Sequence, residues 1–153
     1  MKIRFIKKRE IGQASRIVGQ NYSRAYERSS KKEMMAMFTQ KTMPPKYIVA
    51  EEKGRIVGLV GYVQSWMDYG VFCIFWVNVE KKHQGKGIGY TLVKKAIEKI
   101  KNIRDKKDPP RLILLTATSA NSRFYGKKFG FERLAEFKDG NYLMGLQLDK
   151  KNI

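Results

Sequence analysis

Three glycines at alternate positions, Gly85, Gly87 and Gly89, lie in a short basic turn between an apolar run and an amphipathic segment. A glycine in such a turn lets an anion approach the backbone without meeting a Cβ atom. The first N–H groups of a helix have no intrahelical partners and lie at the positive end of the helix dipole. A strand, a glycine turn and a helix in this order therefore predict a phosphate site, and we expect a phosphate-bearing cofactor there.

The spacing of the glycines excludes two common phosphate sites. A P-loop requires glycine, four residues and then Gly-Lys-Ser/Thr, and the chain has no such run. A dinucleotide fingerprint requires a third glycine three residues after the second, where this chain has Tyr90. It also requires an acid at the end of the next strand, whereas Asp105 and Asp108 lie in a polar linker.

Two buried strands and one long helix are expected to position this turn. Residues 71–80 (VFCIFWVNVE) form an apolar run without alternation, as in a strand covered on both faces. Residues 88–103 carry apolar side chains at spacings of three and four, as on one face of a helix. Residues 111–117 (RLILLTA) form a second buried strand, which is parallel to the first if the helix is a right-handed crossover.

The rest of the chain divides into further strands and helices. The alternating segments expected to form strands are residues 2–7, 46–52, 55–64, 131–137 and 141–148, with hairpin turns at Lys53-Gly54 and Asp139-Gly140. Gly58 and Gly61 inside one strand predict a bulge or a close backbone approach. The expected helices span residues 10–20, a segment that Ser30 caps with Glu33 three positions on, and residues 118–130, with Ser119 or Asn121 as cap and Gly130 as stop.

Length and composition predict a single domain over residues 1–153, globular at 42% hydrophobic and 12% aromatic residues. No apolar run approaches the roughly 20 residues of a membrane helix, and no apolar stretch of signal-peptide length follows the basic N-terminus. The lone Cys73 fits a reducing, cytoplasmic interior. With one histidine and one cysteine we expect no metal site.

The chain has 32 basic and 14 acidic residues, a formal charge of +18. Part of this charge suits an anionic cofactor, and the rest suggests either an acidic partner or a solvated lysine surface. Polycationic substrates such as aminoglycosides or polyamines fit poorly, since the field would repel them. We expect no membrane partner, and a homodimer remains an open alternative.

The run Gln84-Gly85-Lys86-Gly87-Ile88-Gly89 resembles the Gln/Arg-x-x-Gly-x-Gly/Ala signature of the GNAT superfamily of N-acetyltransferases. The element order looks like this family over about residues 1–148, although only residues 75–91 and 118–132 carry motif residues. The resemblance implies a mixed α/β (α+β) fold. Its central, twisted, mostly antiparallel sheet would have six to seven strands and a parallel, splayed central pair, flanked by about four helices. Acetyl-CoA would be the acyl donor.

The resemblance also implies the cofactor-binding residues. Backbone groups of Val77, Asn78 and Val79 would pair with the pantetheine arm like an added strand. The pyrophosphate would lie on the turn formed by Gln84, Gly85, Lys86, Gly87, Ile88, Gly89 and Tyr90. Asn121 would orient the arm, and Tyr125 would lie near the thioester sulfur. A phenol with a pKa of about 10 can protonate a thiolate, so Tyr125 is the candidate general acid.

Candidates for the other roles are less specific. Asp68 and Glu80 flank the strand at residues 71–80, and either could act as a general base through water; an enzyme without a dedicated base is the alternative. His83 is expected to face solvent or a phosphate, and Cys73 is expected to be packed. We expect an aromatic-lined acceptor site with Tyr22, Tyr26, Trp66 and Asp68 among its residues.

The leading hypothesis is an acetyl-CoA-dependent N-acetyltransferase that acts on a small-molecule, peptide or protein amine by direct attack. A basic nucleic-acid-binding module, whose glycine turn grips backbone phosphates, is the second hypothesis; it predicts strongly salt-dependent binding. The third is a catalytically silent family member that binds CoA as a sensor.

Overall fold

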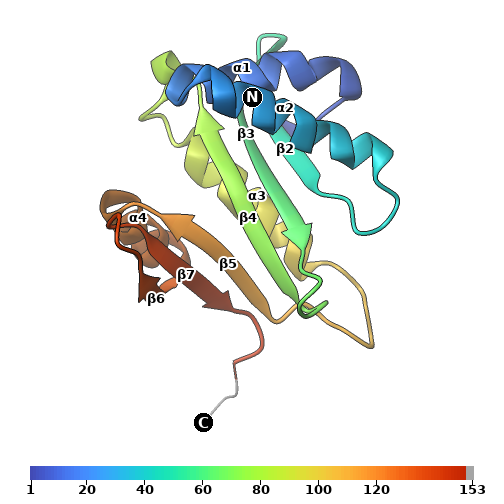
Figure 1. The fold of residues 1–153 in the computed structure, drawn as a ribbon, viewed down its shortest axis with the longest axis vertical. Coiled ribbons are helices and arrows are strands. Elements are labelled where there is room, and N and C mark those ends of the chain that lie inside the picture. The colour runs from blue at the N-terminus through green and yellow to red at the C-terminus, as the bar shows by residue number, and fades with distance from the viewer. Residues whose placement is uncertain (151–153) are drawn as a thin grey trace.

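A computed structural model describes residues 1–150, in which seven strands form one sheet with the order β1-β2-β3-β4-β5-β7-β6 (Figure 1). The strands are β1 (Lys2–Phe5), β2 (Lys46–Glu52), β3 (Arg55–Gln64), β4 (Val71–Val79), β5 (Leu112–Ala117), β6 (Glu132–Glu136) and β7 (Tyr142–Gln147). The α-helices are α1 (Ile11–Asn21), α2 (Arg24–Thr39), α3 (Ile88–Lys101) and α4 (Ser119–Phe129), with short 3-10 turns η1 (Lys8–Glu10) and η2 (Lys81–His83).

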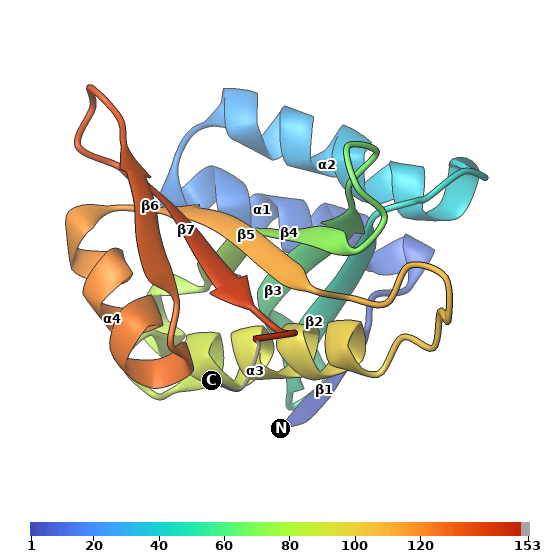
Figure 2. The ribbon, with the colours of Figure 1, turned by 90° about the horizontal axis from the view of Figure 1, so that it is seen from below.

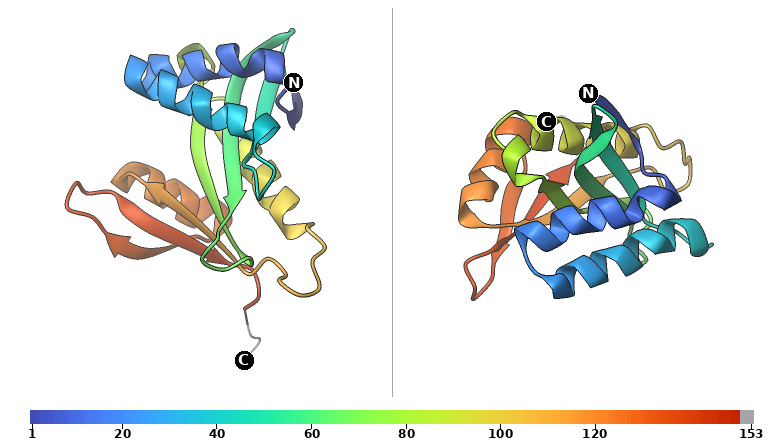
Figure 3. Two further views of the ribbon diagram at one scale, coloured as in Figure 1. Left: turned by 45° about the vertical axis from the view of Figure 1, so that its right-hand side comes forward. Right: turned by 90° about the horizontal axis from the view of Figure 1, so that it is seen from above.

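The sheet is antiparallel except where β4 and β5 meet. These two strands pair in parallel only from Val71 to Cys73 and from Leu112 to Leu114. Beyond these pairs they diverge, so that β5, β7, β6 and α4 swing away from the rest of the sheet (Figures 1 and 3). The expected fold, with its parallel and splayed central pair, is confirmed.

Helices cover the sheet on both faces, α1 and α2 on one side and α3 on the other (Figure 2). The apolar face of α3 is buried as its periodicity predicts, through Ile88, Leu92, Val93, Ala96, Ile97 and Ile100. A second core lies under α1 and α2 and includes Val18, Met34 and Tyr47. Burial on both faces explains why β3 and β4 have apolar residues without alternation. No helix within residues 1–150 combines the length and apolar character needed to cross a membrane.

A bulge interrupts the pairing of β3 with β4 near the divergence of β4 and β5. The register shifts between Leu59 and Gly61, and Trp76 opposite has a φ of 51°. A Cβ atom at Gly61 would lie 2.7 Å from the Phe75 ring and 2.8 Å from the Tyr47 ring. The glycine is therefore required because two aromatic rings lie against its backbone, which confirms the close approach expected at this position.

Replacing Gly61 by alanine should lower the free energy of unfolding by about 1–3 kcal/mol, because neither ring can move without displacing its packed neighbours. Chemical denaturation measures the change. Gly12→Ala in α1 is the matched control: its Cβ would meet only the Arg16 side chain at 3.7 Å, and it should be neutral or stabilising. Equal stability of the two variants would contradict the packing account.

Two predicted helix starts are wrong. Ser23, not Ser30, caps α2, and its hydroxyl accepts a hydrogen bond from the Tyr26 N–H at 3.3 Å. Ser30 lies inside the helix, where its hydroxyl donates to the Glu27 carbonyl. The helix runs without a break from Arg24, so the residue directly before it, Ser23, is the cap. Thr118 caps α4, in place of the predicted Ser119 or Asn121, whereas Gly130 ends α4 with a φ of 83° as predicted.

Candidate active site

A cavity of about 810 Å³ lies between the end of β4, the glycine turn and the start of α3, with α1 and α4 at its sides. We call it the turn cavity. Eleven of the twelve predicted cofactor-binding residues line it: Val77, Asn78, Val79, Gln84, Gly85, Gly87, Ile88, Gly89, Tyr90, Asn121 and Tyr125. The twelfth, Lys86, is exposed and does not line the cavity.

The glycine turn presents backbone donors to the turn cavity. Gly85 and Gly87 have φ values of 78° and 83°, and a Cβ atom at either would meet only open space within 4 Å. The first hydrogen bond of α3 runs from the Thr91 N–H to the Gly87 carbonyl, at 3.1 Å. The N–H groups of residues 88–90 precede this bond and are therefore the donors that a helix leaves without intrahelical partners. They can hold an anion, and Lys81 and His83 on the same cavity add donors.

The end of β4 offers a further donor. The N–H of Glu80 donates to the Val57 carbonyl of β3 at 2.8 Å. Successive N–H groups along a strand point to opposite sides, so the N–H of Val79 points away from β3 and toward the turn cavity. By the same alternation the backbone of Asn78 faces its partner Leu59 in β3. The open edge of β4 is therefore formed by Val77 and Val79.

Asn21 at the end of α1 joins this edge, which sequence reasoning missed. Its Nδ2 donates to Asn78 Oδ1 at 3.0 Å and to the Val79 carbonyl at 3.1 Å. Asn21 Oδ1 and Asn78 Nδ2 are buried without a hydrogen-bond partner among residues 1–150. The Asn21 side chain therefore connects the end of α1 to Asn78 and Val79 at the end of β4. Nothing in the local sequence around Asn21 indicated this contact.

Tyr125 lies where α4 closes the turn cavity. Burial, with a smaller contribution from Tyr22, raises its pKa to about 12. Its ring packs edge-to-face on Phe124 and Phe131, with centroids 5.3 and 5.8 Å away. The phenol is therefore fixed in position and remains protonated at neutral pH, as a proton donor must be.

A second cavity of about 450 Å³ occupies the gap where β4 and β5 diverge. We call it the aromatic cavity. It shares four lining residues with the turn cavity: Tyr22, Val77, Asn121 and Tyr125. Tyr22, Tyr26 and Trp76 form one side, which we call the aromatic wall, with ring centroids 5.8–6.2 Å apart and edge-to-face packing. The structure thus places the predicted Tyr22 and Tyr26 together, and adds Trp76, whose exposure depends on the bulge in β4.

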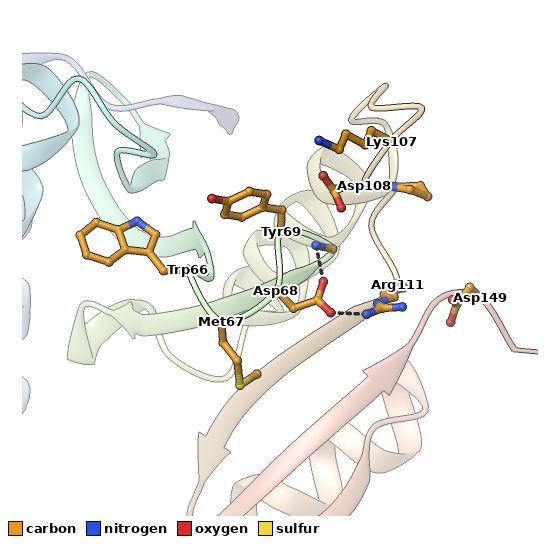
Figure 4. A pocket seen from close by; sticks show the side chains of 10 residues that line it. Trp66, Met67, Asp68, Tyr69, Lys107, Asp108, Arg111 and Asp149 are labelled. Atoms are coloured by element: carbon orange, nitrogen blue, oxygen red, sulfur yellow. Dashed lines mark hydrogen bonds and ion pairs between the residues drawn. The ribbon is translucent and has the colours of Figure 1, made fainter.

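The structure does not bring Asp68 and Trp66 to these cavities. Both belong to the β3–β4 connection and line a separate hollow of about 380 Å³ at the opposite end of β4 (Figure 4). The Asp68 carboxylate accepts hydrogen bonds from the Arg111 guanidinium and from the Gly70 N–H, and both lower its pKa. The predicted base and acceptor roles of these residues are therefore corrected: Asp68 is a paired carboxylate remote from Tyr125.

Glu80 lines neither cavity. Its carboxylate contacts Arg55 at 3.3 Å and Lys82 at 3.5 Å, and lies 3.5 Å from His83 Nδ1. It lines a shallow hollow with Gln13 and Arg16 of α1 instead. The structure therefore does not place Glu80 beside Tyr125, and β4 ends at Val79, one residue before the predicted end.

Residues 44–133 match a family model described as an acetyltransferase (GNAT) domain. No curated protein matches the sequence. The family model covers more than half of the chain, so the protein belongs to the GNAT acetyltransferase family.

Solved structures of this family have the same fold. A GNAT-family protein of Desulfovibrio desulfuricans aligns with a TM-score of 0.79 at 15% identity, over 95% of this chain and 98% of its own. An aminoglycoside 6'-N-acetyltransferase complexed with coenzyme A aligns with a TM-score of 0.76 at 15% identity, over 99% and 100%. A GNAT-family acetyltransferase of Brucella melitensis in complex with acetyl-CoA aligns with a TM-score of 0.71 at 16% identity, over 99% and 90%.

Proposed function

We propose that the protein is a cytoplasmic N-acetyltransferase that moves the acetyl group of acetyl-CoA to a primary amine by direct attack in a ternary complex. One observation carries this proposal: the turn cavity, with its backbone donors, meets the aromatic cavity at the Tyr125 ring. A donor in the first cavity and an acceptor in the second would come together beside a protonated phenol.

The turn cavity fits coenzyme A group by group. Its pyrophosphate matches the free N–H groups after Gly87, which lie at the positive end of α3. Its pantetheine arm carries amides, and an amide can pair with the open edge of β4 formed by Val77 and Val79. The cavity volume, about 810 Å³, lies within the range of ligand sites.

The residues at the junction suit acyl transfer. Bound acetyl-CoA supplies a thioester whose carbonyl carbon accepts the amine. The N–H of Val79 is oriented to stabilise negative charge on the carbonyl oxygen. Tyr125 can give its proton to the departing sulfur, because a phenol is a sufficient acid for a thiolate whose usual pKa is about 8.5.

Direct transfer is favoured over a covalent acyl-enzyme. Cys73 is the single cysteine of the chain and lines neither cavity, and burial raises the pKa of its thiol. A thiol in that state is a poor nucleophile. With donor and acceptor held in adjoining cavities, proximity supplies much of the rate enhancement.

Acetyl-CoA should protect the protein from thermal unfolding, whereas ATP and NAD should not. At a concentration of about 100 Kd the expected stabilisation is about 2.7 kcal/mol, or a Tm increase of roughly 5–10 °C. Differential scanning fluorimetry measures it. Equal protection by ATP, combined with strongly salt-dependent binding of nucleic acid, would instead favour the nucleic-acid-binding alternative.

Release of free CoA thiol with a panel of primary amines tests the reaction itself. The proposal requires release that depends on the amine and on intact Tyr125. Protection by acetyl-CoA without release for any amine would indicate a CoA-binding sensor.

A further inference from the structure

The linings of the two cavities contain few ionisable side chains and no carboxylate among the described residues. Within residues 1–150, no aspartate or glutamate lines either one. The ionisable side chains there are tyrosines, Lys81 and His83, and the last two lie on the turn cavity. The aromatic cavity, where an acceptor would bind, has no charged side chain in its lining. An amine that enters it must arrive without its proton or lose it on burial.

This requirement separates amines by their own basicity. An α-amino group has a pKa of about 7.7–8.0, so about a third of it is neutral at pH 7.5. A lysine side chain has a pKa of about 10.4, so only about one in a thousand is neutral. The net charge of +18 further opposes the approach of a protonated amine. The site therefore favours an α-amino group over an alkylamine by a factor on the order of 100.

An open backbone edge borders the same cavity. The N–H of Leu148 donates to the Arg111 carbonyl at 2.8 Å, which is a bond on the β7 side of β5. Alternation along β5 then turns the N–H and carbonyl of Thr116 to the other side, where β4 pairs only as far as Leu114. Thr116 lines the aromatic cavity. A residue of an extended peptide can exchange two hydrogen bonds with such an edge.

The aromatic wall is the third feature of the cavity that bears on the acceptor, after the uncharged lining and the open edge at Thr116. Tyr22 and Tyr26 are 61% and 51% exposed, and with Trp76 they line the same cavity as Thr116. Glu33 of α2 contacts this wall, because its carboxylate accepts a hydrogen bond from the Trp76 Nε1–H, but it does not line the cavity. The three ring surfaces suit an aromatic or large apolar side chain. The volume of about 450 Å³ fits one residue and its flanking peptide groups.

We propose that the acceptor is the α-amino group of a peptide whose first residue carries an aromatic or large apolar side chain. The first side chain lies on the aromatic wall, the peptide group pairs with the backbone of Thr116, and the amine attacks the thioester at Tyr125. The amine nitrogen gains the acetyl group and loses one proton to solvent. The C–S bond of the thioester breaks, the CoA sulfur takes the Tyr125 proton and leaves as a thiol, and Tyr125 regains a proton from solvent. This inference rests on the proposed acetyltransferase function.

The first experiment compares four acceptors at pH 7.5 by thiol release under saturating acetyl-CoA. They are a four-residue peptide amide that begins with phenylalanine, the same peptide beginning with glycine, an N-acetylated peptide with one free lysine, and phenethylamine. The phenylalanine peptide should exceed the glycine peptide in kcat/KM by at least about tenfold. It should exceed the lysine peptide by about 100-fold or more.

The outcomes separate the two proposals. Faster release with the lysine peptide or with phenethylamine would overturn this inference and leave the acetyltransferase function standing. Release with none of the acceptors would contradict the acetyltransferase function, and the inference with it.

The pH profile of kcat/KM tests the origin of the neutral amine. With the phenylalanine peptide it should rise and level off near pH 8, at the pKa of the peptide's own amine. With the lysine peptide it should continue to rise toward pH 10. A break at one fixed pH for both acceptors would reveal a base on the enzyme and overturn the account.

Tyr26→Ala should reduce the preference for phenylalanine over glycine from about tenfold to about twofold, because it removes part of the aromatic wall. Tyr69→Ala is the matched control, since Tyr69 is also 51% exposed but lines the remote hollow beside Asp68. Tyr26→Phe should retain the preference. An unchanged preference in Tyr26→Ala, or an equal loss in Tyr69→Ala, would contradict the proposed position of the first side chain.

Discussion

Tyr125→Phe should lower kcat for amine acetylation by about 10²–10³-fold, with acetyl-CoA protection largely retained. The substitution removes only the hydroxyl, and the ring contacts with Phe124 and Phe131 remain. The departing sulfur then loses the buried phenol as its proton donor; Tyr22, which also lines both cavities, is 61% exposed. Single-turnover thiol release measures the chemical step, and scanning fluorimetry measures the protection.

Tyr62→Phe is the control for this prediction. Tyr62 and Tyr125 are each 7% exposed, and burial raises the pKa of each to about 12. Tyr62 lines neither cavity, so its variant should keep kcat within about threefold of the wild type. A loss of less than threefold in Tyr125→Phe would remove Tyr125 from the mechanism. Because the pKa of Tyr125 is raised, its hydroxyl should cause no decline in rate below about pH 11.

Gly87→Val should weaken acetyl-CoA binding by at least about 100-fold. A β-branched side chain at a φ of 83° is strained, and its Cβ would occupy the space through which a phosphate reaches the start of α3. Loss of several charge-assisted backbone hydrogen bonds accounts for the size of the effect. Titration calorimetry with CoA measures the affinity directly.

Gly54→Val is the matched control for the glycine turn. Gly54 has a φ of 78° and open space around its Cβ position, but it lies in the β2–β3 hairpin turn and lines neither cavity. Both variants should lose comparable stability from backbone strain, about 1–3 kcal/mol, and only Gly87→Val should lose the coenzyme. Equal affinity in the two variants would mean that the glycine turn does not hold the pyrophosphate.

Much of the fold could be predicted because its signals are local. The helical spacing of apolar residues in α3, the unbroken apolar run of β4 and the glycines at Lys53-Gly54 and Asp139-Gly140 each require only a few neighbours in sequence. The lining of the turn cavity was predicted from the family resemblance, since residues 77–79 and 84–90 are continuous around one strand end.

The acceptor side could not be predicted in the same way. Trp76 lies at a bulge in the pairing of β4 with β3, beside Gly61 of β3 and the Tyr47 ring of β2. Asn21 contacts Asn78 across 57 positions of sequence, without a local motif. Asp68 precedes β4 and therefore lies at the end of the strand opposite the turn cavity. Glu80 follows β4 at the cavity end, but its carboxylate contacts Arg55, Lys82 and His83 instead of lining the cavity. Position next to a strand in sequence indicates neither which end of the strand borders the cavity nor which way the side chain points.

The structure of the protein with acetyl-CoA, determined by crystallography, tests the central claim most directly. We predict the pyrophosphate within hydrogen-bond distance of the backbone N–H groups of residues 85–90 and the thioester sulfur beside the Tyr125 hydroxyl. Coenzyme bound elsewhere on the chain, or no binding even at millimolar concentration, would contradict it.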